Sequence, residues 1–596
     1  MPGIIKNIVK NILPVAATVF LLLVLLFSVG LKNTTAPVSE EIIEETTESD
    51  TSKVEEPEPD LALSEEEIIT DEDEEEPLEN LMVPFDVENT YSYCKNPKCL
   101  IDENKENIVY SFDFTNGIPR SDDDNVYLFE FSTYEDDETE GKKAIQIASK
   151  AKEVSIEVPY EERYLFSRFA PAVKYEGEYI LLENAKYVMN PEALAYNTCD
   201  YFSPDSKKGI LLDANTIDKP ELYDLNVKRA VYNIPLSFII GETENESVPT
   251  IEYEYNGETY EFDGFMCGGF DSLISYLTQQ GIHTTIIILN DWNKEHPEII
   301  HPKARKRTGR SQYYAFNTEE EEGVRLMEAT AMFLAERYSG GSEYGLVNDW
   351  IIANEVNQQK IWNYMDTKDI DYYTESFERS FRTFYNAIKS NYSNAKVYYS
   401  IDHDFNDNYG NNGRFFNGKE FLYKFNEYAD KGGNYDWSLS IHPYPNPLSK
   451  VKFWKGSFDK TENAGVLTPM NLSSVTDIMK KTEFLNNKGE VRDIGITELG
   501  FSSGAGEKLQ AAAFAYCYYI VENNEYICSF LMNRQTDDAG ALKSGLRLGI
   551  YNYDYSPKYI KKVFTNVDGE NRDELINEML EVIGAGSLEE ALSWAE

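Results

Sequence analysis

The fold of this chain is decided by two short stretches, WIIANEVN at residues 350–357 and IGITELG at residues 494–500. Each begins with the apolar residues of a buried strand and then presents one glutamate, Glu355 in the first and Glu498 in the second. A carboxylate at the end of a buried strand is unexpected unless the mouth of a barrel requires it, because catalytic groups gather at the carboxyl ends of barrel strands.

The residues around these stretches alternate between strand-like and helical patterns from Lys228 onward. Eight apolar runs predict strands at 230–240, 284–290, 312–317, 350–356, 396–402, 437–442, 493–499 and 526–532. Helical periods lie between them, such as Tyr373, Phe377, Phe381, Phe384 and Ile388. Eight strand–helix units predict an α/β fold, a (β/α)8 TIM barrel over residues 227–596. A doubly wound open sheet is the alternative, but the sequence contains no G-x-G-x-x-G or P-loop motif to support it.

The region before the barrel, residues 81–226, has the period-2 alternation of short strands. The clearest runs are separated by Gly, Asn and Asp and lie at 107–114, 144–148, 154–158 and 179–182. We therefore expect a smaller β-rich, sandwich-like domain. It is either a carbohydrate-binding or docking module or a purely structural domain, and the pattern fits both.

The N-terminal residues predict a membrane anchor. Ile12–Leu31 carries no charged side chain, and such a helix spans about 30 Å, the thickness of a bilayer's hydrocarbon core. Lys6 and Lys10 precede it, which predicts residues 1–11 in the cytoplasm, a single transmembrane helix at 12–31 and the rest of the chain outside the cell. A cleaved signal peptide, which would make the protein secreted, is the alternative. Residues 32–80 predict an acidic, disordered stalk, because Glu40–Glu79 holds twenty Asp and Glu against one Lys.

Composition excludes two classes of protein. With 55 Lys and Arg against 104 Asp and Glu, the formal charge is −49, and a nucleic-acid binder is excluded because nothing would neutralise the phosphates. Six cysteines in 596 residues exclude a disulfide-dense scaffold, although one small disulfide between Cys94 and Cys99 is compatible with their spacing. We expect no metal and no organic cofactor, and the sequence does not indicate an oligomeric state.

The two glutamates supply the groups that glycoside hydrolysis needs. One carboxyl must be protonated to release the leaving-group oxygen, and a second must be ionised to attack the anomeric carbon. Retaining enzymes hold the pair about 5–5.5 Å apart, and like charges this close split the two pKa values. We expect Glu355 to be the general acid/base and Glu498 the nucleophile, with His442 and Tyr444 supporting them from the end of strand six.

At these residues the chain resembles clan A of the glycoside hydrolases, which pairs an Asn-Glu acid/base on strand four with a Glu nucleophile on strand seven of a (β/α)8 barrel. Asn354-Glu355 and Glu498 match that pattern. The resemblance implies a retaining O-glycoside hydrolase in which Asn354 contacts the sugar 2-hydroxyl. The chain is still more similar to a bacterial domain-of-unknown-function family of glycosidase-like proteins, over roughly residues 95–567, through the stretches at 169–195, 232–237, 350–357 and 496–503.

Two features common in the clan are missing, a tryptophan at the end of strand eight and an arginine near the end of strand two. Strand eight ends instead in LMNRQ at 531–535, and the strand that we count as the second ends in NDW at 290–292. We expect the sugar to be contacted by Asn354, His442, Tyr444, Asn290, Trp292 and Asn533.

The sequence therefore predicts a membrane-anchored, extracellular retaining glycoside hydrolase acting on a polysaccharide or oligosaccharide. A transglycosylase would use the same two carboxylates. The alternative is a non-catalytic, cell-surface glycan-binding or wall-associated protein on a degenerate barrel. The missing tryptophan favours this alternative, and the intact Asn-Glu and Glu pair disfavours it.

Overall fold

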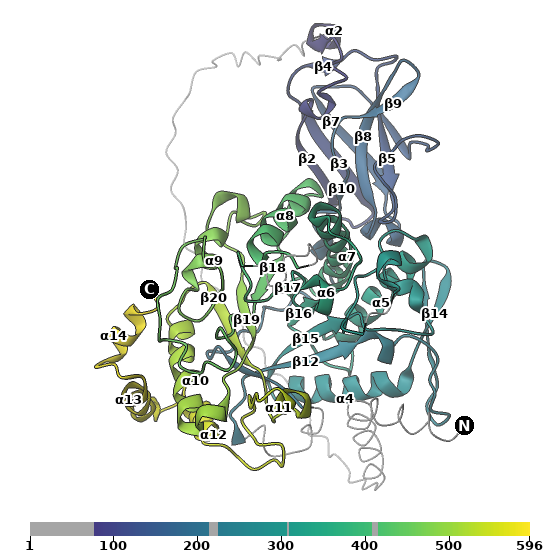
Figure 1. The fold of residues 1–596 in the computed structure, drawn as a ribbon. Coiled ribbons are helices and arrows are strands. Elements are labelled where there is room, and N and C mark those ends of the chain that lie inside the picture. Colours follow the sequence, from purple (N-terminus) through teal and green to yellow (C-terminus); the bar gives the residue numbers. More distant parts are fainter. Residues whose placement is uncertain (1–76, 214–223, 307–308, 408–414) are drawn as a thin grey trace, which may run out of the picture. The chain divides into compact units, whose positions relative to one another are not determined.

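The computed structural model describes residues 77–213, 224–306, 309–407 and 415–596 (Figure 1). The chain divides into two units, Met1–Leu81 and Met82–Glu596, and the first contains helix α2, Leu78–Leu81. The segments predicted as cytoplasmic (1–11) and transmembrane (12–31) lie outside the described residues, as does the predicted stalk up to residue 76. Among the described residues, no helix has the length and apolar character needed to cross a membrane.

Eight parallel strands close into a barrel in their order along the chain. They are β11 (Lys208–Leu211), β12 (Arg229–Pro235), β15 (His283–Leu289), β16 (Asp349–Ile352), β17 (Lys396–Ile401), β18 (Ser438–Ile441), β19 (Ile494–Leu499) and β20 (Ile527–Met532). The ring closes where β11 pairs with β20. Apolar side chains from several strands fill the interior, namely Val231, Ile287, Leu289, Ile351, Tyr398 and Leu531. The predicted α/β barrel is confirmed.

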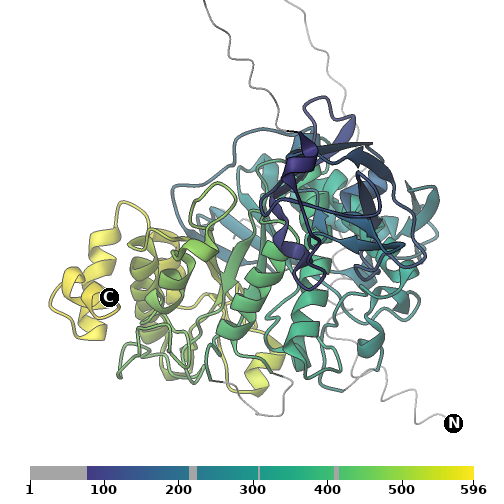
Figure 2. The same ribbon diagram turned by 90° about the horizontal axis from the view of Figure 1, so that it is seen from above.

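Helices alternate with the strands and surround the barrel (Figure 1). They are α4 (Gly264–Gln279), α5 (Glu321–Tyr338), α6 (Gln359–Trp362), α7 (Ile370–Asn391), α8 (Gly418–Lys431), α9 (Ser473–Met479), α10 (Glu507–Glu522), α11 (Ala539–Lys543) and α12 (Ile560–Asn566). The last two helices, α13 (Arg572–Ile583) and α14 (Leu588–Ser593), pack on α10 (Figure 2). The hairpin β13 (Ile251–Tyr255) and β14 (Glu258–Phe262) precedes α4.

The predicted strand count reached eight through two errors that cancel. Residues 312–317 are not a barrel strand, because Tyr313 and Phe316 form only isolated bridges within the long loop that leaves β15. Strand β11 was missed, because its four residues are too few to show a period-2 pattern. It lies in the stretch assigned to the β-rich region, so the barrel begins before the predicted boundary at residue 227. The strands that carry the two glutamates remain the fourth and the seventh.

The residues before the barrel form two antiparallel sheets. The first contains β2 (Cys94–Ile101), β3 (Asn107–Phe114) and β7 (Glu153–Pro159). The second contains β10 (Lys186–Tyr187), β8 (Arg168–Tyr175), β9 (Glu178–Leu181), β5 (Asn125–Phe131) and β6 (Gln146–Ser149), and a short pair joins β1 (Met82–Val83) to β4 (Ile118–Pro119). Every second residue of β3 and β7 is buried, as expected for sheets with one covered face. The six cysteines are free, so Cys94 and Cys99 do not form a disulfide.

Helix α7 is packed from two sides. Its predicted apolar stripe is buried against the barrel, and on another face it contacts the β-rich region. Arg382 donates hydrogen bonds to the carbonyl oxygens of Val188, at 3.1 Å, and Gly433, at 2.9 Å. Asn386 donates to the carbonyl oxygen of Leu165 at 2.7 Å. The β-rich region therefore covers a barrel helix that would otherwise face solvent.

Candidate active site

The two predicted glutamates lie at the carboxyl ends of barrel strands four and seven. Glu498 belongs to β19, whereas Glu355 lies in the turn that leaves β16. In that turn Ala353 has a φ of 62° and Glu355 a φ of 40°, and each such left-handed, non-glycine residue costs about 1–3 kcal/mol. The backbone N–H of Glu355 donates to Oγ of Ser400, on β17, at 2.8 Å. A strained turn fixed by the neighbouring strand therefore positions the Glu355 side chain.

The side chains of Glu355, His442 and Glu498 converge at the mouth of the barrel. One carboxylate oxygen from each glutamate and one ring nitrogen of His442 lie within 4.8 Å of one another. His442 follows β18 and is buried, with Nδ1 2.9 Å from Oε1 of Glu355 and Nε2 3.2 Å from Oγ1 of Thr497. Thr497 is also hydrogen-bonded to Oγ of Ser440. The imidazole ring therefore joins Glu355 to a pair of hydroxyl groups.

Glu498 is held by two neutral donors. Oη of Tyr444 and Nδ2 of Asn533 each donate to Oε1 of Glu498 at 2.8 Å, and Asn533 also donates to Oη of Tyr444 at 2.8 Å. Burial and the neighbouring Glu498 carboxylate raise the pKa of Tyr444, which therefore keeps its proton. Hydrogen bonds from neutral donors stabilise the ionised form of a carboxylate. Asn533, predicted as a sugar contact, thus also holds Glu498.

Glu355 has surroundings that favour its protonated form. The pKa of Glu355 is raised to about 7, chiefly by burial and also by the charges of Asp402 and Glu498, which together outweigh the lowering effect of His442. For His442, burial lowers the pKa, but the hydrogen bond with Glu355 and the charge of Glu498 outweigh burial and raise it. Close to neutral pH, Glu355 and His442 therefore favour a state with one proton more than an ionised carboxylate and a neutral imidazole carry together, and this additional proton is shared between them.

A group of buried acids beside Glu355 adds to this effect. Asn357 donates to Oδ1 of Asp402 at 2.7 Å, and Nε2 of Gln358 donates to Oδ2 of Asp402 at 2.5 Å and to Oδ2 of Asp404 at 2.8 Å. Burial, followed by the charge of Asp402, raises the pKa of Asp404 to about 7. The negative charge of this group disfavours a second charge on Glu355.

Asn290 and Trp292 are not part of this hydrogen-bonded group. Nδ2 of Asn290 donates to the carbonyl oxygen of Ala315 at 3.2 Å, so its amide holds the loop that leaves β15. Trp292 packs edge-on against Tyr314, with ring centroids 5.5 Å apart. These contacts explain how the loop folds, and the sugar contacts expected of Asn290 and Trp292 stay predictions.

Contrary to the prediction from the sequence, residues 290–292 do not follow the second barrel strand. Asn290 and Trp292 follow β15, the third barrel strand, whereas strand two is β12 and ends at Pro235. Asn354 is buried directly before Glu355, and its contact with a sugar 2-hydroxyl stays a prediction.

Two aromatic residues at the mouth were missed because they lie on loops. The backbone of Tyr313 bridges Asp291 at the end of β15, and its ring packs against the apolar cluster inside the barrel. Burial, Asp291 and Glu498 raise the pKa of Tyr313 to about 12. The ring of Trp362, at the end of α6, lies 5.8 Å from that of Tyr313 with a tilt of 30°. The two loops meet because they leave the paired neighbours β15 and β16, and the backbone N–H of Gln312 donates to the carbonyl oxygen of Ile361 at 2.7 Å.

Glu355, His442 and Glu498 are close enough to hold a cation between them. Their polar atoms are, however, already paired. Nδ1 of His442 lies against Glu355, and Oε1 of Glu498 accepts two hydrogen bonds. This arrangement suits acid–base chemistry, in which one group holds a proton and the other a negative charge.

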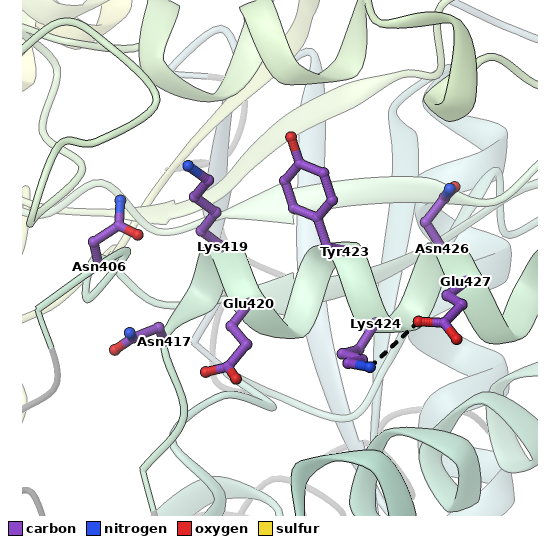
Figure 3. Close-up of a pocket in the computed structure, with 8 residues that line it drawn as sticks. All are labelled: Asn406, Asn417, Lys419, Glu420, Tyr423, Lys424, Asn426 and Glu427. Atoms are coloured by element: carbon purple, nitrogen blue, oxygen red, sulfur yellow. Dashed lines mark hydrogen bonds and ion pairs between the residues drawn. The ribbon is translucent and has the colours of Figure 1, made fainter.

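A separate hollow lies along helix α8 (Figure 3). Its lining is polar and consists of Asn406, Asn417, Lys419, Glu420, Tyr423, Lys424, Asn426 and Glu427. Lys424 and Glu427, one turn apart on α8, form an ion pair of 3.3 Å along it. The hollow shares no residue with the group around Glu355, and Asn406 and Asn417 flank residues 408–414, which lie outside the described chain.

Fold and site together define a (β/α)8 barrel protein with two glutamates of opposite surroundings at the ends of strands four and seven. The chain belongs to the family of unknown function DUF5722, whose model matches residues 200–591. The expected membership in a family of unknown function is therefore confirmed. A comparison with curated proteins found no match.

Solved structures of several glycoside hydrolases are similar to this chain. A family 39 glycoside hydrolase from the gut symbiont Bacteroides cellulosilyticus WH2 has 14% identity over 81% of this chain and 80% of its own, with a TM-score of 0.40. An exo-β-1,4-mannosidase from Opitutaceae bacterium strain TAV5 has 13% identity over 64% and 62%, with a TM-score of 0.37. A family 1 β-glucosidase from Thermotoga maritima has 11% identity over 62% and 99%, with a TM-score of 0.36. Function has to be inferred from the site itself.

Proposed function

We propose that this protein is a retaining O-glycoside hydrolase of an oligosaccharide or polysaccharide, with Glu355 as general acid/base and Glu498 as nucleophile. The observation that carries the proposal is the glutamate pair, in which a carboxylate oxygen of one lies within 4.8 Å of a carboxylate oxygen of the other. Retaining enzymes hold their carboxyl groups about 5–5.5 Å apart, whereas inverting enzymes leave about 6.5–9.5 Å for a water molecule. The observed closeness supports the retaining mechanism.

The proposed reaction has two steps, and the two glutamates with one water molecule account for every bond and proton in them. First, a carboxylate oxygen of Glu498 bonds to the anomeric carbon, and the leaving oxygen takes the electron pair of the broken bond and the proton of Glu355. Second, water attacks the anomeric carbon, Glu355 accepts its proton, and the electron pair of the glycosyl bond returns to Glu498. A sugar hydroxyl in place of water would give transglycosylation.

The surroundings of each glutamate support its assigned role. Tyr444 and Asn533 stabilise Glu498 as an anion, the form that attacks. Burial and nearby acids keep a proton on the pair of Glu355 and His442, as a general acid requires.

Tyr313 and Trp362 offer an aromatic surface at the same mouth. Aromatic faces pack well against the apolar C–H faces of sugar rings, and these two residues would replace the tryptophan missing from strand eight. Asn354, beside Glu355, is assigned to the sugar 2-hydroxyl.

The cellular location is proposed from the sequence. Residues 12–31 would anchor the protein in the membrane, or direct its secretion if cleaved, and the acidic segment would hold the barrel away from the surface. The substrate would then be an extracellular glycan.

The test incubates the full-length protein with plant, bacterial and host polysaccharides beside its Glu498→Gln variant. Release of sugars that disappears in the variant, with retention at the anomeric carbon followed by proton NMR, is the expected result. Release undiminished in the variant would overturn the role of Glu498. Binding without release by either protein would instead favour a glycan-binding protein, the reading that the missing strand-eight tryptophan supports.

A further inference from the structure

A chain of hydrogen bonds leads from Glu355 to buried residues behind the site. It runs from Glu355 through Nδ1 and Nε2 of His442 to Oγ1 of Thr497 and on to Oγ of Ser440. His442, Thr497 and Ser440 are all buried, so water does not compete for these bonds. Thr497 lies on β19 and Ser440 on β18, two hydrogen-bonded neighbours in the barrel.

We infer that Thr497 is a positioning residue whose hydroxyl accepts the Nε2–H of His442, and so leaves Nδ1 as the ring atom that shares a proton with Glu355. The placement of the imidazole proton follows from the contacts of this chain. Its consequence for catalysis rests on the proposed function.

Counting protons on the pair gives the direction of the Thr497 bond. If the shared proton is on Glu355, Nδ1 must accept it, and a neutral ring with a bare Nδ1 carries its own hydrogen on Nε2. If the shared proton is on Nδ1, the ring is an imidazolium and Nε2 again carries a hydrogen. In both forms Nε2 donates to Thr497, and Thr497 donates to Ser440.

Loss of the shared proton reverses the donor and acceptor roles along this chain of hydrogen bonds. With Glu355 ionised and the ring neutral, Nδ1–H facing the carboxylate is favoured, Nε2 is bare and Thr497 donates to it. The hydroxyls of Thr497 and Ser440 can rotate to suit either state without any heavy atom moving. The chain therefore adapts to both protonation states that a general acid/base passes through.

The charged groups around the ring favour the state in which Glu355 and His442 keep the shared proton. Glu355, Glu498 and Asp402 all stabilise a positive charge on His442, whereas His403, the other titratable neighbour, opposes it when protonated. Asp404 acts on Glu355 from the same side as Asp402. Removing the acceptor at Nε2 should therefore lower the pKa of His442, which the surrounding acids raise.

The direct test is nitrogen NMR on full-length protein labelled in its histidines, which number only five. The His442 signals are assigned by their loss in His442→Asn. At neutral pH the wild type should show a protonated Nε2, and in Thr497→Val the pKa of His442 should fall by about one to two pH units, the effect of losing one hydrogen bond to a charged group. Thr497→Ser retains the hydroxyl and should restore the wild-type titration.

A wild-type His442 with a bare Nε2 at neutral pH would overturn the inference, whether or not Thr497→Val folds. An unchanged His442 titration in a folded Thr497→Val protein would overturn it as well. On any substrate found, Thr497→Val should move the alkaline limb of kcat/KM to lower pH, and Thr497→Ser should not. A protein that cleaves no glycan but shows these NMR results would contradict the proposed function and leave this inference standing.

Discussion

The two glutamates of the site belong to the same barrel mouth, yet their surroundings differ in kind. Glu498 lies within strand β19, where the pairing with β20 shifts register, and accepts hydrogen bonds from two neutral donors, Tyr444 and Asn533. Glu355 lies in a strained turn, shares a hydrogen bond with a titratable partner, His442, and has further acids nearby. Identical side chains are thus prepared for opposite states of charge. In the proposed mechanism the neighbours, and not the residue type, assign the chemical role of each glutamate.

The largest expected effect follows from removing the carboxylate of Glu498. Glu498→Gln keeps the size and the hydrogen-bonding shape of the side chain but removes the nucleophile, so turnover should fall by at least about 10⁴-fold. Initial rates on the substrate found by the glycan panel measure it. Glu420→Gln, an exposed glutamate on α8, is the matched control and should keep wild-type rates. Similar losses in both variants would remove Glu498 from the mechanism.

The next effect separates the acid from the nucleophile. Glu355→Gln should slow cleavage of natural glycosides by about 10²–10⁴-fold, the usual contribution of general acid catalysis. With a dinitrophenyl glycoside, whose leaving group needs no proton, the glycosyl-enzyme step should be nearly unaffected. A burst of dinitrophenol followed by a slow phase is the signature to measure. Equal losses on both substrates would mean that Glu355 does not act as the acid.

A smaller effect concerns the donors that hold Glu498 ionised. Asn533→Ala removes one of two hydrogen bonds to the carboxylate, worth about 1.5–3 kcal/mol, so kcat/KM should fall by about 10–100-fold. Initial rates over a range of substrate concentrations measure the change. Asn116→Ala, an exposed asparagine of the β-rich region, serves as the control. An unchanged kcat/KM in a folded Asn533→Ala protein would leave Asn533 with a packing role only.

The smallest effect is a change in unfolding free energy that follows from the raised pKa of Glu355. The pKa of Glu355 is about 7 in the folded protein against 4.5 for the ordinary group, so the folded state binds more protons between these values. That stabilising contribution is fully present below about pH 4.5 and is lost as the pH rises through about 7. Glutamine does not titrate, so Glu355→Gln should gain about 1–3 kcal/mol in unfolding free energy relative to wild type between about pH 5 and pH 8. Thermal unfolding at several pH values measures this, and a difference independent of pH would contradict it.

The barrel and its two glutamates were predictable because local patterns encode them. Apolar strands such as 350–352 and 494–496 are buried on both faces, and the glutamate that follows each one interrupts the pattern where the barrel mouth begins. His442 and Tyr444 follow the same logic after β18.

Other parts of the site are set by contacts that no local pattern carries. Thr497 and Ser440 read as ordinary strand residues, and only the pairing of β18 with β19 brings their hydroxyls together. Tyr313 and Trp362 lie on different loops. Strand β11 is too short to be recognised without the partners β12 and β20 that define it.

The packing of α7 determines what happens when the β-rich region is separated from the barrel. One face of α7 is buried against the barrel, and another face contacts the sheets that precede it in the chain. Arg382 and Asn386 are buried at this second contact, so neither side chain is exposed to water. Separating the two regions would leave the carbonyl oxygens of Val188 and Leu165 without these donors. We therefore expect the barrel to be less stable when the β-rich region is removed.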